Sequence, residues 1–191
     1  MCGITGIFCF SERAAQQSLH QTAAALHTLR RRGPDSAGSY QTEQVAIAQA
    51  RLAIIDTSDA ANQPFADPTG RYQMVFNGEI FNFQELKQQL SAYEYRTHSD
   101  TEVLLYAYIH WGEKMLERLN GFFTIAIYDT LRHELFLARD RYGVKPLLLY
   151  QDEERLIFAS EMKALLAFQI PKKLNYESLA LYFLISEGYS A

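Results

Sequence analysis

The sequence lacks the features that mark secreted, membrane-spanning or disulfide-stabilised proteins. Its 191 residues contain two cysteines, too few for the disulfide framework of a secreted domain, so we expect a reducing cytoplasmic compartment. The longest largely apolar runs, Phe122–Tyr128 and Leu179–Ile185, have seven residues each, whereas a transmembrane helix needs about 20. The N-terminus also lacks the basic region and apolar core of a secretory signal. We therefore expect no association with a membrane.

A strong charge of either sign is also missing. The formal net charge is −4, and 48% of the residues are hydrophobic. Disorder requires low hydrophobicity together with high net charge, so it is excluded. A mildly acidic chain gives no support for a basic surface that binds nucleic acid. A chain of this length forms one domain or at most two small ones, and it can bury a self-sufficient core.

Apolar patterning predicts blocks of strands separated by helices. We expect strands at residues 3–10, 45–55, 72–76, 122–128, 134–138, 147–150 and 156–159. We expect helices at residues 13–29, 83–90, 101–111, 161–168 and 176–185. Several strands are joined by short turns, which requires antiparallel pairing, because parallel strands need crossovers of a dozen or more residues. The expected fold class is α+β, with helices packed on antiparallel sheets.

Cys2 directly follows Met1. Removal of Met1 would give this cysteine a free α-amino group, whose ordinary pKa of about 7.7–8.0 suits a general base near neutral pH. Such a neighbour readily activates a thiol whose own pKa is about 8.5. One residue would then supply both nucleophile and base. Taken alone, a cysteine at this position is more often incidental.

The segment Asn77-Gly78-Glu79 follows the predicted strand Tyr72–Phe76. A carboxamide donor and a glycine N–H at the end of a strand could form an oxyanion hole. Asn-Gly is also the commonest hairpin dipeptide. From the residues alone, a plain turn is the favoured interpretation.

Arg51 and Asp100 lie at the boundaries of predicted elements. Arginine can bind a carboxylate through two hydrogen bonds and aspartate can bind an ammonium group, so together with Glu79 they would suit a zwitterionic amino acid. Taken singly, each is more often a surface salt-bridge partner.

We expect no metal site. Cys2 and Cys9 are seven residues apart on a predicted strand, so their side chains would point to opposite faces. His20 and His27 lie two helical turns apart, about 10.5 Å, which is too far to share one ion.

Seven segments, taken in this order, resemble the class II glutamine amidotransferase domain, an N-terminal-nucleophile hydrolase. The resemblance covers residues 2–168. The matching segments are Met1–Ile4, Arg32–Asp35, Arg51–Asp56, Asn77–Ile80, Ser99–Val103, Arg139–Leu147 and Phe158–Glu161. The acidic Glu79 after Asn77-Gly78 is similar to the asparagine-synthetase branch of this family.

The resemblance implies a catalytic role for three residues. Cys2, exposed by removal of Met1, would attack the side-chain amide of glutamine. The side chain of Asn77 and the N–H of Gly78 would hold the oxyanion.

The resemblance also implies a binding site for the other end of L-glutamine. Arg51 would bind its α-carboxylate, while Glu79 and Asp100 would hold its α-ammonium group. Backbone contacts are expected near Ile54, and Asn77 and Gly78 belong to the same substrate site.

The implied fold is a four-layer α/β/β/α sandwich with two antiparallel sheets. Residues 169–191 would be a linker and the start of an absent C-terminal synthetase domain of the same polypeptide. That domain would use ammonia to convert aspartate to asparagine, and ATP and Mg²⁺ would belong to it. No cofactor is expected in the amidotransferase domain, and a homodimer is compatible with the resemblance.

Two alternatives stay open. The acceptor could be a different carboxylate, such as a sugar acid or an antibiotic precursor, because the acceptor pocket would lie in the synthetase domain. The chain could instead be an inactive module that retains Met1 and binds glutamine or a partner without turnover.

Overall fold

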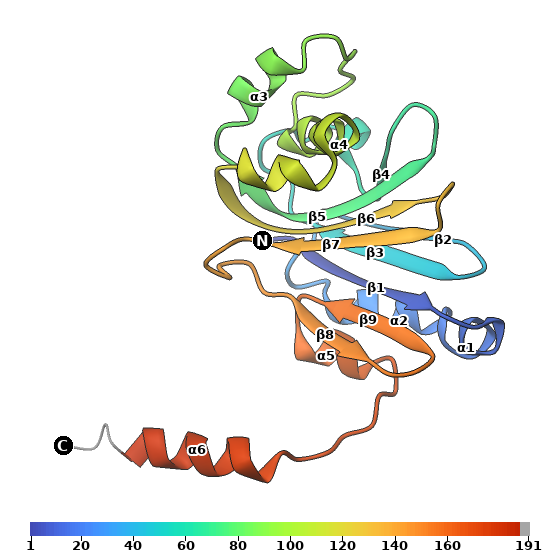
Figure 1. The fold of residues 1–191 in the computed structure, drawn as a ribbon, viewed down its shortest axis with the longest axis vertical. Helices are drawn as coiled ribbons and strands as arrows, with labels where there is room; N and C mark the ends of the chain where they lie inside the picture. Colours follow the sequence, from blue (N-terminus) through green and yellow to red (C-terminus); the bar gives the residue numbers. More distant parts are fainter. Residues whose placement is uncertain (188–191) are drawn as a thin grey trace.

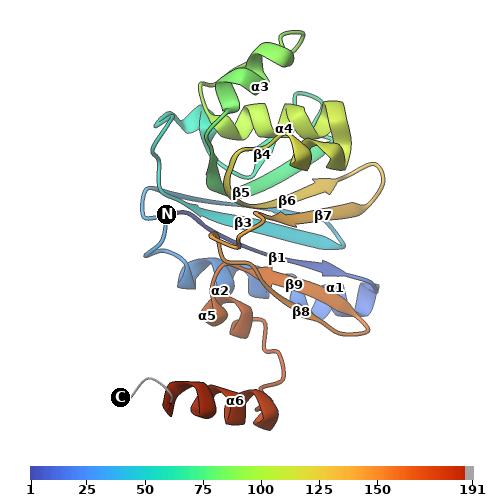
Figure 2. The same cartoon turned by 60° about the vertical axis from the view of Figure 1, so that its left-hand side comes forward.

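The computed structural model describes residues 1–187 and contains two antiparallel sheets that face each other, with helices on both outer sides (Figures 1 and 2). The five-stranded sheet has the order β2-β3-β1-β9-β8, and the four-stranded sheet has the order β4-β5-β6-β7. The strands are β1 (Gly3–Cys9), β2 (Ser36–Gln41), β3 (Val45–Arg51), β4 (Phe65–Ala66), β5 (Tyr72–Ile80), β6 (Gly121–Asp129), β7 (Glu134–Arg139), β8 (Leu148–Gln151) and β9 (Arg155–Ala159). The predicted α+β sandwich is confirmed.

The helices form the outer layers. They are α1 (Glu12–Ser18), α2 (Gln21–Thr28), α3 (Phe83–Gln89), α4 (Asp100–Trp111), α5 (Met162–Leu166) and α6 (Tyr176–Glu187), with short 3₁₀ segments η1 (Asp59–Ala61) and η2 (Gly112–Glu117). Helices α1, α2 and α5 cover the five-stranded sheet, while α3 and α4 cover the four-stranded sheet (Figure 1).

Alternation along each strand separates the core into layers. In β5, Met74 and Phe76 pack in the cluster that contains the apolar residues of α4, whereas Val75 packs with Ile4 and Ile47 of the opposite sheet. This follows from the pleat, which directs successive side chains to opposite faces. The side chain of Asn77, two residues after Val75, therefore lies on the face of β5 that looks toward the other sheet.

Asn77 and Gly78 lie inside β5, so the plain turn favoured by the residues alone is wrong. Pairing with β6 continues through both positions, with Asn77 opposite Thr124 and Gly78 opposite Phe123. A β-carbon at Gly78 would lie 2.3 Å from the carbonyl oxygen of Phe122. Glycine is needed here for close approach of two strands and not for a turn.

The helix predicted at residues 13–29 is divided into α1 and α2. The two helices share one buried stripe with a helical spacing of three or four residues, which comprises Ala14, Ser18, Thr22, Ala25 and Leu29. The break between α1 and α2 preserves this spacing, and the apolar pattern of the sequence therefore predicts one continuous helix. Ser11 caps the N-terminus of α1, since its hydroxyl accepts a hydrogen bond from Ala14 N–H at 3.2 Å.

The strand predicted at 45–55 ends at Arg51, and β2 and β4 were not predicted. β2 has the sequence SAGSYQ and lies at the edge of its sheet, so it has no apolar run that would mark it. β4 has only two residues, too few to show a period.

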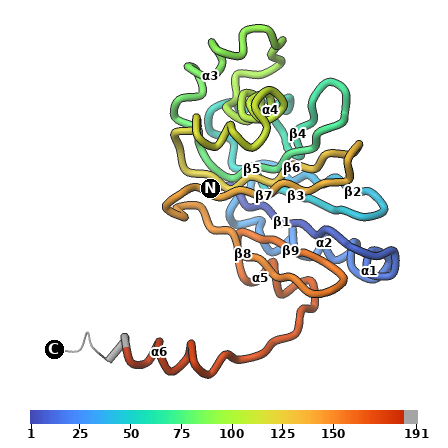
Figure 3. The backbone as a smooth tube through the Cα atoms, viewed as in Figure 1, coloured from blue at the N-terminus to red at the C-terminus, as the bar shows by residue number. Residues whose placement is uncertain are grey.

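Helix α6 lies apart from the sandwich, at the end of an extended segment (Figures 1 and 3). Its exposed apolar side chains include Tyr176, Leu181, Tyr182 and Leu184. None of the helices within residues 1–187 combines the length and the apolar character needed to cross a bilayer.

Candidate functional site

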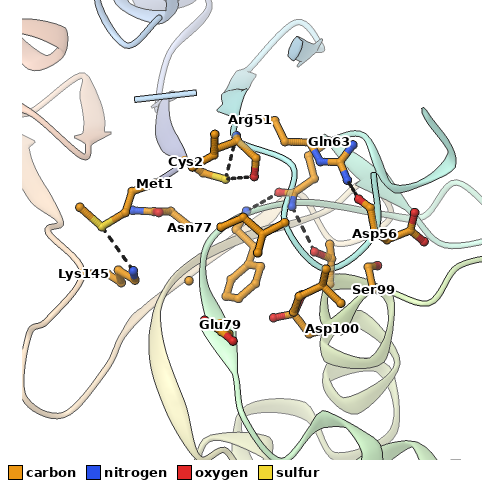
Figure 4. Close-up of a pocket in the computed structure, with 16 residues that line it drawn as sticks. Met1, Cys2, Arg51, Asp56, Gln63, Asn77, Glu79, Ser99, Asp100 and Lys145 are labelled. Atoms are coloured by element: carbon orange, nitrogen blue, oxygen red, sulfur yellow. Dashed lines mark hydrogen bonds between the residues drawn. The ribbon is translucent and has the colours of Figure 1, made fainter. Parts of the chain in front are cut away.

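One pocket gathers every residue that the sequence singled out for glutamine chemistry. Its lining comes from the N-terminus, the loop after β3, the second half of β5, the first turn of α4 and the segment between β7 and β8 (Figure 4). The predicted residues among the lining are Cys2, Arg51, Ile54, Asn77, Gly78, Glu79 and Asp100. Segments up to 98 positions apart in the sequence, from Cys2 to Asp100, therefore meet in one place.

Cys2 lies just before β1 and is held from two sides. Its Sγ is 3.6 Å from the carbonyl oxygen of Leu52 and accepts from Leu52 N–H at 3.4 Å. Its carbonyl oxygen accepts from Arg32 Nε at 2.9 Å, and Arg32 also pairs with Glu161 at 3.1 Å. Cys2 is thus half-buried at the pocket, while its backbone is anchored to Arg32 in the turn that follows α2.

Met1 lines the same pocket as Cys2. Its Sδ lies 3.4 Å from the ammonium group of Lys145, which is also part of the lining (Figure 4). Removal of Met1 would therefore free the nitrogen of Cys2 in a pocket that Lys145 also lines.

The second cysteine has a different environment. Cys9 is fully buried at the far end of β1, and burial raises the pKa of its thiol to about 11. A thiol with such a pKa is almost entirely protonated near neutral pH. Of the two cysteines, Cys2 is the one placed for chemistry.

Asn77 and Gly78 present two donors at the pocket. Phe123, opposite Gly78 in β6, directs both its N–H and its C=O to Asp140 in the segment after β7, at 3.3 and 2.8 Å. Gly78 and Phe123 are therefore a non-hydrogen-bonded pair, and the N–H of Gly78 points away from β6. The Nδ2 atom of Asn77 is buried and has no partner within residues 1–187. Such an orphan donor is rare in a folded protein unless a ligand uses it.

The acidic side of the pocket consists of Glu79 and Asp100. Asp100 is 5% exposed, and its carboxylate accepts from Ile80 N–H at 3.0 Å. Burial raises the pKa of Asp100 to about 6, and the nearby charge of Glu79 acts in the same direction, while hydrogen bonds from Ile80 and Thr101 N–H oppose it. A buried carboxylate that a cationic ligand can reach would gain that ligand's charge as compensation.

Arg51 is also buried, with 7% of its surface exposed. Its Nη1 donates to the carbonyl oxygen of Ser58 at 3.1 Å and to Asn62 Oδ1 at 2.7 Å, and its Nη2 donates to the carbonyl oxygen of Asp56. Arg51 thus binds three oxygen atoms of the loop that follows β3. Its Nε–H and one Nη2–H remain as donors for a ligand. Neither Arg51 nor Asp100 belongs to a salt bridge within residues 1–187, so the surface salt-bridge interpretation does not apply.

The loop that carries Ile54 is supported by the segment Arg32–Asp35. Asp35 accepts from Ala53 N–H at 2.9 Å, and its own N–H donates to the carbonyl oxygen of Arg51 at 3.0 Å. Ile54 itself is 69% exposed at the rim. The segment Arg32–Asp35 is one of the motifs identified in the sequence. Only the structure shows that it supports the loop that carries Ile54.

Sequence reasoning missed Gln63 and Lys145 as pocket residues. Lys145 lies in a segment that carries the family resemblance, so that signal was available. Gln63 lies in a polar loop, where nothing distinguishes it from its neighbours. Within residues 1–187 no three His, Cys, Asp or Glu side chains gather in a way that could hold a metal ion.

Comparisons with known proteins agree with this geometry. The family model of the glutamine amidotransferase domain matches residues 1–190. Asparagine synthetase [glutamine-hydrolyzing] 3 of Bacillus subtilis is 39% identical over 172 residues, which are 87% of this chain and 28% of that protein. Amidase chry2 of Gibberella zeae is 32% identical over 190 residues, 94% of this chain and 28% of that protein.

Among solved structures, the glutamine phosphoribosylpyrophosphate amidotransferase from B. subtilis, complexed with ADP and GMP, matches with a TM-score of 0.73 and 25% identity. The match covers 88% of this chain and 44% of that one. The chain thus spans less than a third of the two curated relatives and less than half of this structure. The family match over nearly the whole sequence is decisive, and the chain belongs to the glutamine amidotransferase domain family.

Proposed function

We propose that the chain hydrolyses L-glutamine to glutamate and ammonia, with Cys2 as the nucleophile after removal of Met1. The α-amine of Cys2 takes the thiol proton, and the thiolate attacks the side-chain carbonyl carbon of glutamine. The carbon–nitrogen bond then breaks, the amine returns the proton to the leaving nitrogen, and ammonia departs as a thioester forms. Water then attacks the thioester, which releases glutamate and restores the thiol. The observation that carries this proposal is the placement of Cys2 Sγ in the same pocket as the unpartnered Asn77 Nδ2.

Removal of Met1 is part of the mechanism. In the unprocessed chain the nitrogen of Cys2 is an amide, which cannot accept a proton. A free α-amine has an ordinary pKa of about 7.7–8.0, so a large fraction is neutral near pH 7.5 and can take the thiol proton.

The oxyanion of the tetrahedral intermediate would lie between Asn77 Nδ2 and Gly78 N–H. Among residues 1–187, no protein acceptor at the pocket holds either donor, so neither must break a bond when negative charge develops. Preorganised donors of this kind each contribute about 10²–10³-fold to the rate.

The amino-acid end of glutamine would lie against Arg51, Glu79 and Asp100. The remaining Nε–H and Nη2–H of Arg51 suit the α-carboxylate, with backbone groups near Ile54 beside it. Glu79 and Asp100 suit the α-ammonium group. These opposite charges share one pocket with Cys2. The pocket therefore suits a zwitterionic amino acid that also carries a side-chain amide.

The ammonia would serve a synthetase domain that follows residues 169–191 in the same polypeptide. Relatives named as glutamine-hydrolysing asparagine synthetases support aspartate as the acceptor, and ATP with Mg²⁺ would be used in that second domain. The exposed apolar residues of α6 fit a helix that packs against further protein. One relative is named as an amidase and not as an asparagine synthetase, so a different carboxylate acceptor is kept as the second candidate.

The experiment is a glutaminase assay on the chain after mass spectrometry has verified the loss of Met1. We expect glutamate release from the processed chain and none from Cys2→Ala. Cys9→Ala is the matched control and should keep full activity. Normal turnover by Cys2→Ala would refute the nucleophile, and glutamine binding without turnover by a chain that keeps Met1 would establish the inactive module.

The acceptor needs the longer polypeptide. With aspartate, ATP and Mg²⁺ supplied, that polypeptide should form asparagine from glutamine. Failure to form asparagine while glutaminase activity persists would favour a different carboxylate acceptor.

A further inference from the structure

One edge of β5 pairs with β4 in its first half and faces the pocket in its second half. Beyond the end of β4, side chains make the hydrogen bonds along this edge. β4 pairs only with Met74 and Gln73. Two residues beyond Met74, the N–H of Phe76 donates to Gln63 Oε1 at 2.6 Å, and its C=O accepts from Gln49 Nε2 at 2.5 Å. Two amide side chains thus make the pair of bonds that a neighbouring strand would otherwise make.

The N–H of Gly78 lies between two such held positions. On the same edge, Ile80 N–H donates to Asp100 Oδ2 at 3.0 Å. Groups at alternate positions of a strand point to the same side, so the bonds at Phe76 and Ile80 determine where the Gly78 N–H points.

We propose that Gln49 and Gln63 are positioning residues for the oxyanion hole. They hold the Phe76 peptide and thereby orient the side chain of Asn77 and the N–H of Gly78. The inference rests on the proposed function, because an oxyanion forms only if glutamine is attacked.

The burial of both amides supports this role. Gln49 is 0% exposed and Gln63 is 7% exposed, so water does not compete for their bonds to Phe76. The Oε1 atom of Gln49 is buried without a partner within residues 1–187. Burying the Gln49 side chain in an otherwise apolar part of β3 costs free energy, because its Oε1 atom loses its hydrogen bonds to water. Its bond to Phe76 explains why a glutamine is present at this position.

The two glutamines reach β5 from different parts of the molecule. Gln49 comes from β3 in the opposite sheet, whereas Gln63 follows η1. Gln63 Nε2 also donates to Thr101 Oγ1 at 3.2 Å in the first turn of α4, next to Asp100 (Figure 4). The oxyanion side and the ammonium side of the pocket are therefore joined through one amide.

The test replaces each glutamine with methionine, which has a similar length and shape but does not make the amide hydrogen bonds. For Gln49→Met and Gln63→Met we expect kcat for glutamine hydrolysis to fall about 10–100-fold, the scale expected when a catalytic group is displaced by a fraction of an ångström to an ångström. The KM should change less than about threefold, because the bonds removed only orient donors whose strongest contact with the substrate forms in the transition state.

Two binding measurements separate orientation from a general loss of the pocket. In a Cys2→Ala background, calorimetry should give an unchanged Kd for glutamine in Gln49→Met, and a Kd changed less than about threefold in Gln63→Met, whose amide also contacts Thr101 beside Asp100. With Cys2 present, L-glutamate γ-semialdehyde forms a hemithioacetal whose oxygen occupies the oxyanion position. Inhibition by this aldehyde should weaken in parallel with kcat.

Gln73→Met is the matched control. Gln73 lies on the same strand and is 8% exposed, but its Nε2 donates to the carbonyl oxygen of Gly70 in a turn, at 3.2 Å. Its kcat and KM should equal those of the unaltered chain. Should Gln49→Met fail to fold, Gln49→Asn, whose amide is one methylene short of Phe76, carries the same expected loss of kcat.

Unchanged kcat in both methionine variants would overturn the inference, and so would a loss of glutamine binding as large as the loss of kcat. A processed parent chain without glutaminase activity, or an active Cys2→Ala, would overturn the proposed function itself. The two failures are distinguishable because the parent is assayed first.

Discussion

The first half of β5, Tyr72–Val75, pairs with β6 along its length and also with β4 at Gln73 and Met74, whereas the second half, Phe76–Ile80, pairs with β6 alone within residues 1–187. The first half is ordered by repeated ladder bonds and by apolar side chains that are almost fully buried. The second half is ordered by individual polar side chains from elsewhere, which are Gln49, Gln63 and Asp100.

The difference shows why the site lies where the sheet is incomplete. In a complete sheet, the N–H of Gly78 would bond to a neighbouring strand and could not serve a ligand. At a free edge it would bond to water or to an open loop, and its direction would vary. Side chains that hold the flanking residues leave this one N–H available and still directed.

The largest effect expected in the first half concerns stability. Met74 is fully buried in the cluster beneath α4, so Met74→Ala should lower the free energy of unfolding by about 2–5 kcal/mol, the usual cost of such a cavity. Urea unfolding measures it. The KM for glutamine should stay unchanged wherever the variant is folded, and a specific rise in KM would show that the two halves are not separate.

The largest effect expected in the second half concerns catalysis. Asn77→Ala should lower kcat about 10²–10³-fold, which corresponds to about 2.7–4 kcal/mol. Its thermal stability should stay near that of the unaltered chain, because the Nδ2 atom that is removed has no protein partner within residues 1–187. Steady-state kinetics and thermal unfolding on the same samples check both parts. A large loss of stability with an unchanged kcat would refute the assignment.

The sequence predicted the first half of β5 better than the second. Apolar patterning identified the strand through Phe76, because burial between two layers leaves a visible period. The Asn-Gly pair then favoured a turn, and the strand in fact continues to Ile80. The turn propensity of Asn-Gly is overridden by close packing between β5 and β6, where Gly78 allows a contact that no other residue permits.

For the pocket, recognition of the motif series identified Cys2, Arg51, Asn77 and Asp100, and each lines it. The residues that hold these groups were not identified. Gln49 is one polar residue in an apolar strand, and its partner Phe76 lies 27 positions away in another sheet. No local pattern carries information about a bond of that range.

Replacing Asp100 with asparagine should raise the free energy of unfolding but weaken the binding of glutamine. The pKa of Asp100 is raised by burial to about 6, so the folded state binds its proton more tightly than the unfolded state, where the pKa is about 3.9. The favourable contribution is fully present below pH 4 and is lost as the pH rises through about 6. Asp100→Asn should therefore stabilise the chain by about 2–3 kcal/mol at pH 8, with no gain at pH 4.

The same substitution should raise the KM for glutamine at least about 10-fold, because a charge-assisted bond to the α-ammonium group is lost. In the unaltered chain the KM should also rise as the pH falls below about 6. Unfolding and kinetics between pH 4 and pH 8 measure both effects. A variant that is less stable at pH 8 would show that the buried charge of Asp100 is already compensated without glutamine.

The smallest effect is expected at the other end of the strand pair, where Asp129 lies opposite Tyr72. Arg71 donates to both of its oxygens, at 2.9 and 2.6 Å, and lowers the pKa of Asp129 to about 2, with help from N–H groups of the following turn. The sign is opposite to that of Asp100, since stability is present above pH 4 and is lost as the pH falls toward 2. Because solvent screens the partly exposed Arg71, Asp129→Asn should cost at most about 1 kcal/mol at pH 7, and the cost should shrink at high salt and below pH 4. Since this carboxylate has no part in the pocket, kcat and KM should stay unchanged. An altered KM would show that the paired end of β5 is coupled to the free edge, and that the division of the strand into a stabilising half and a catalytic half is wrong.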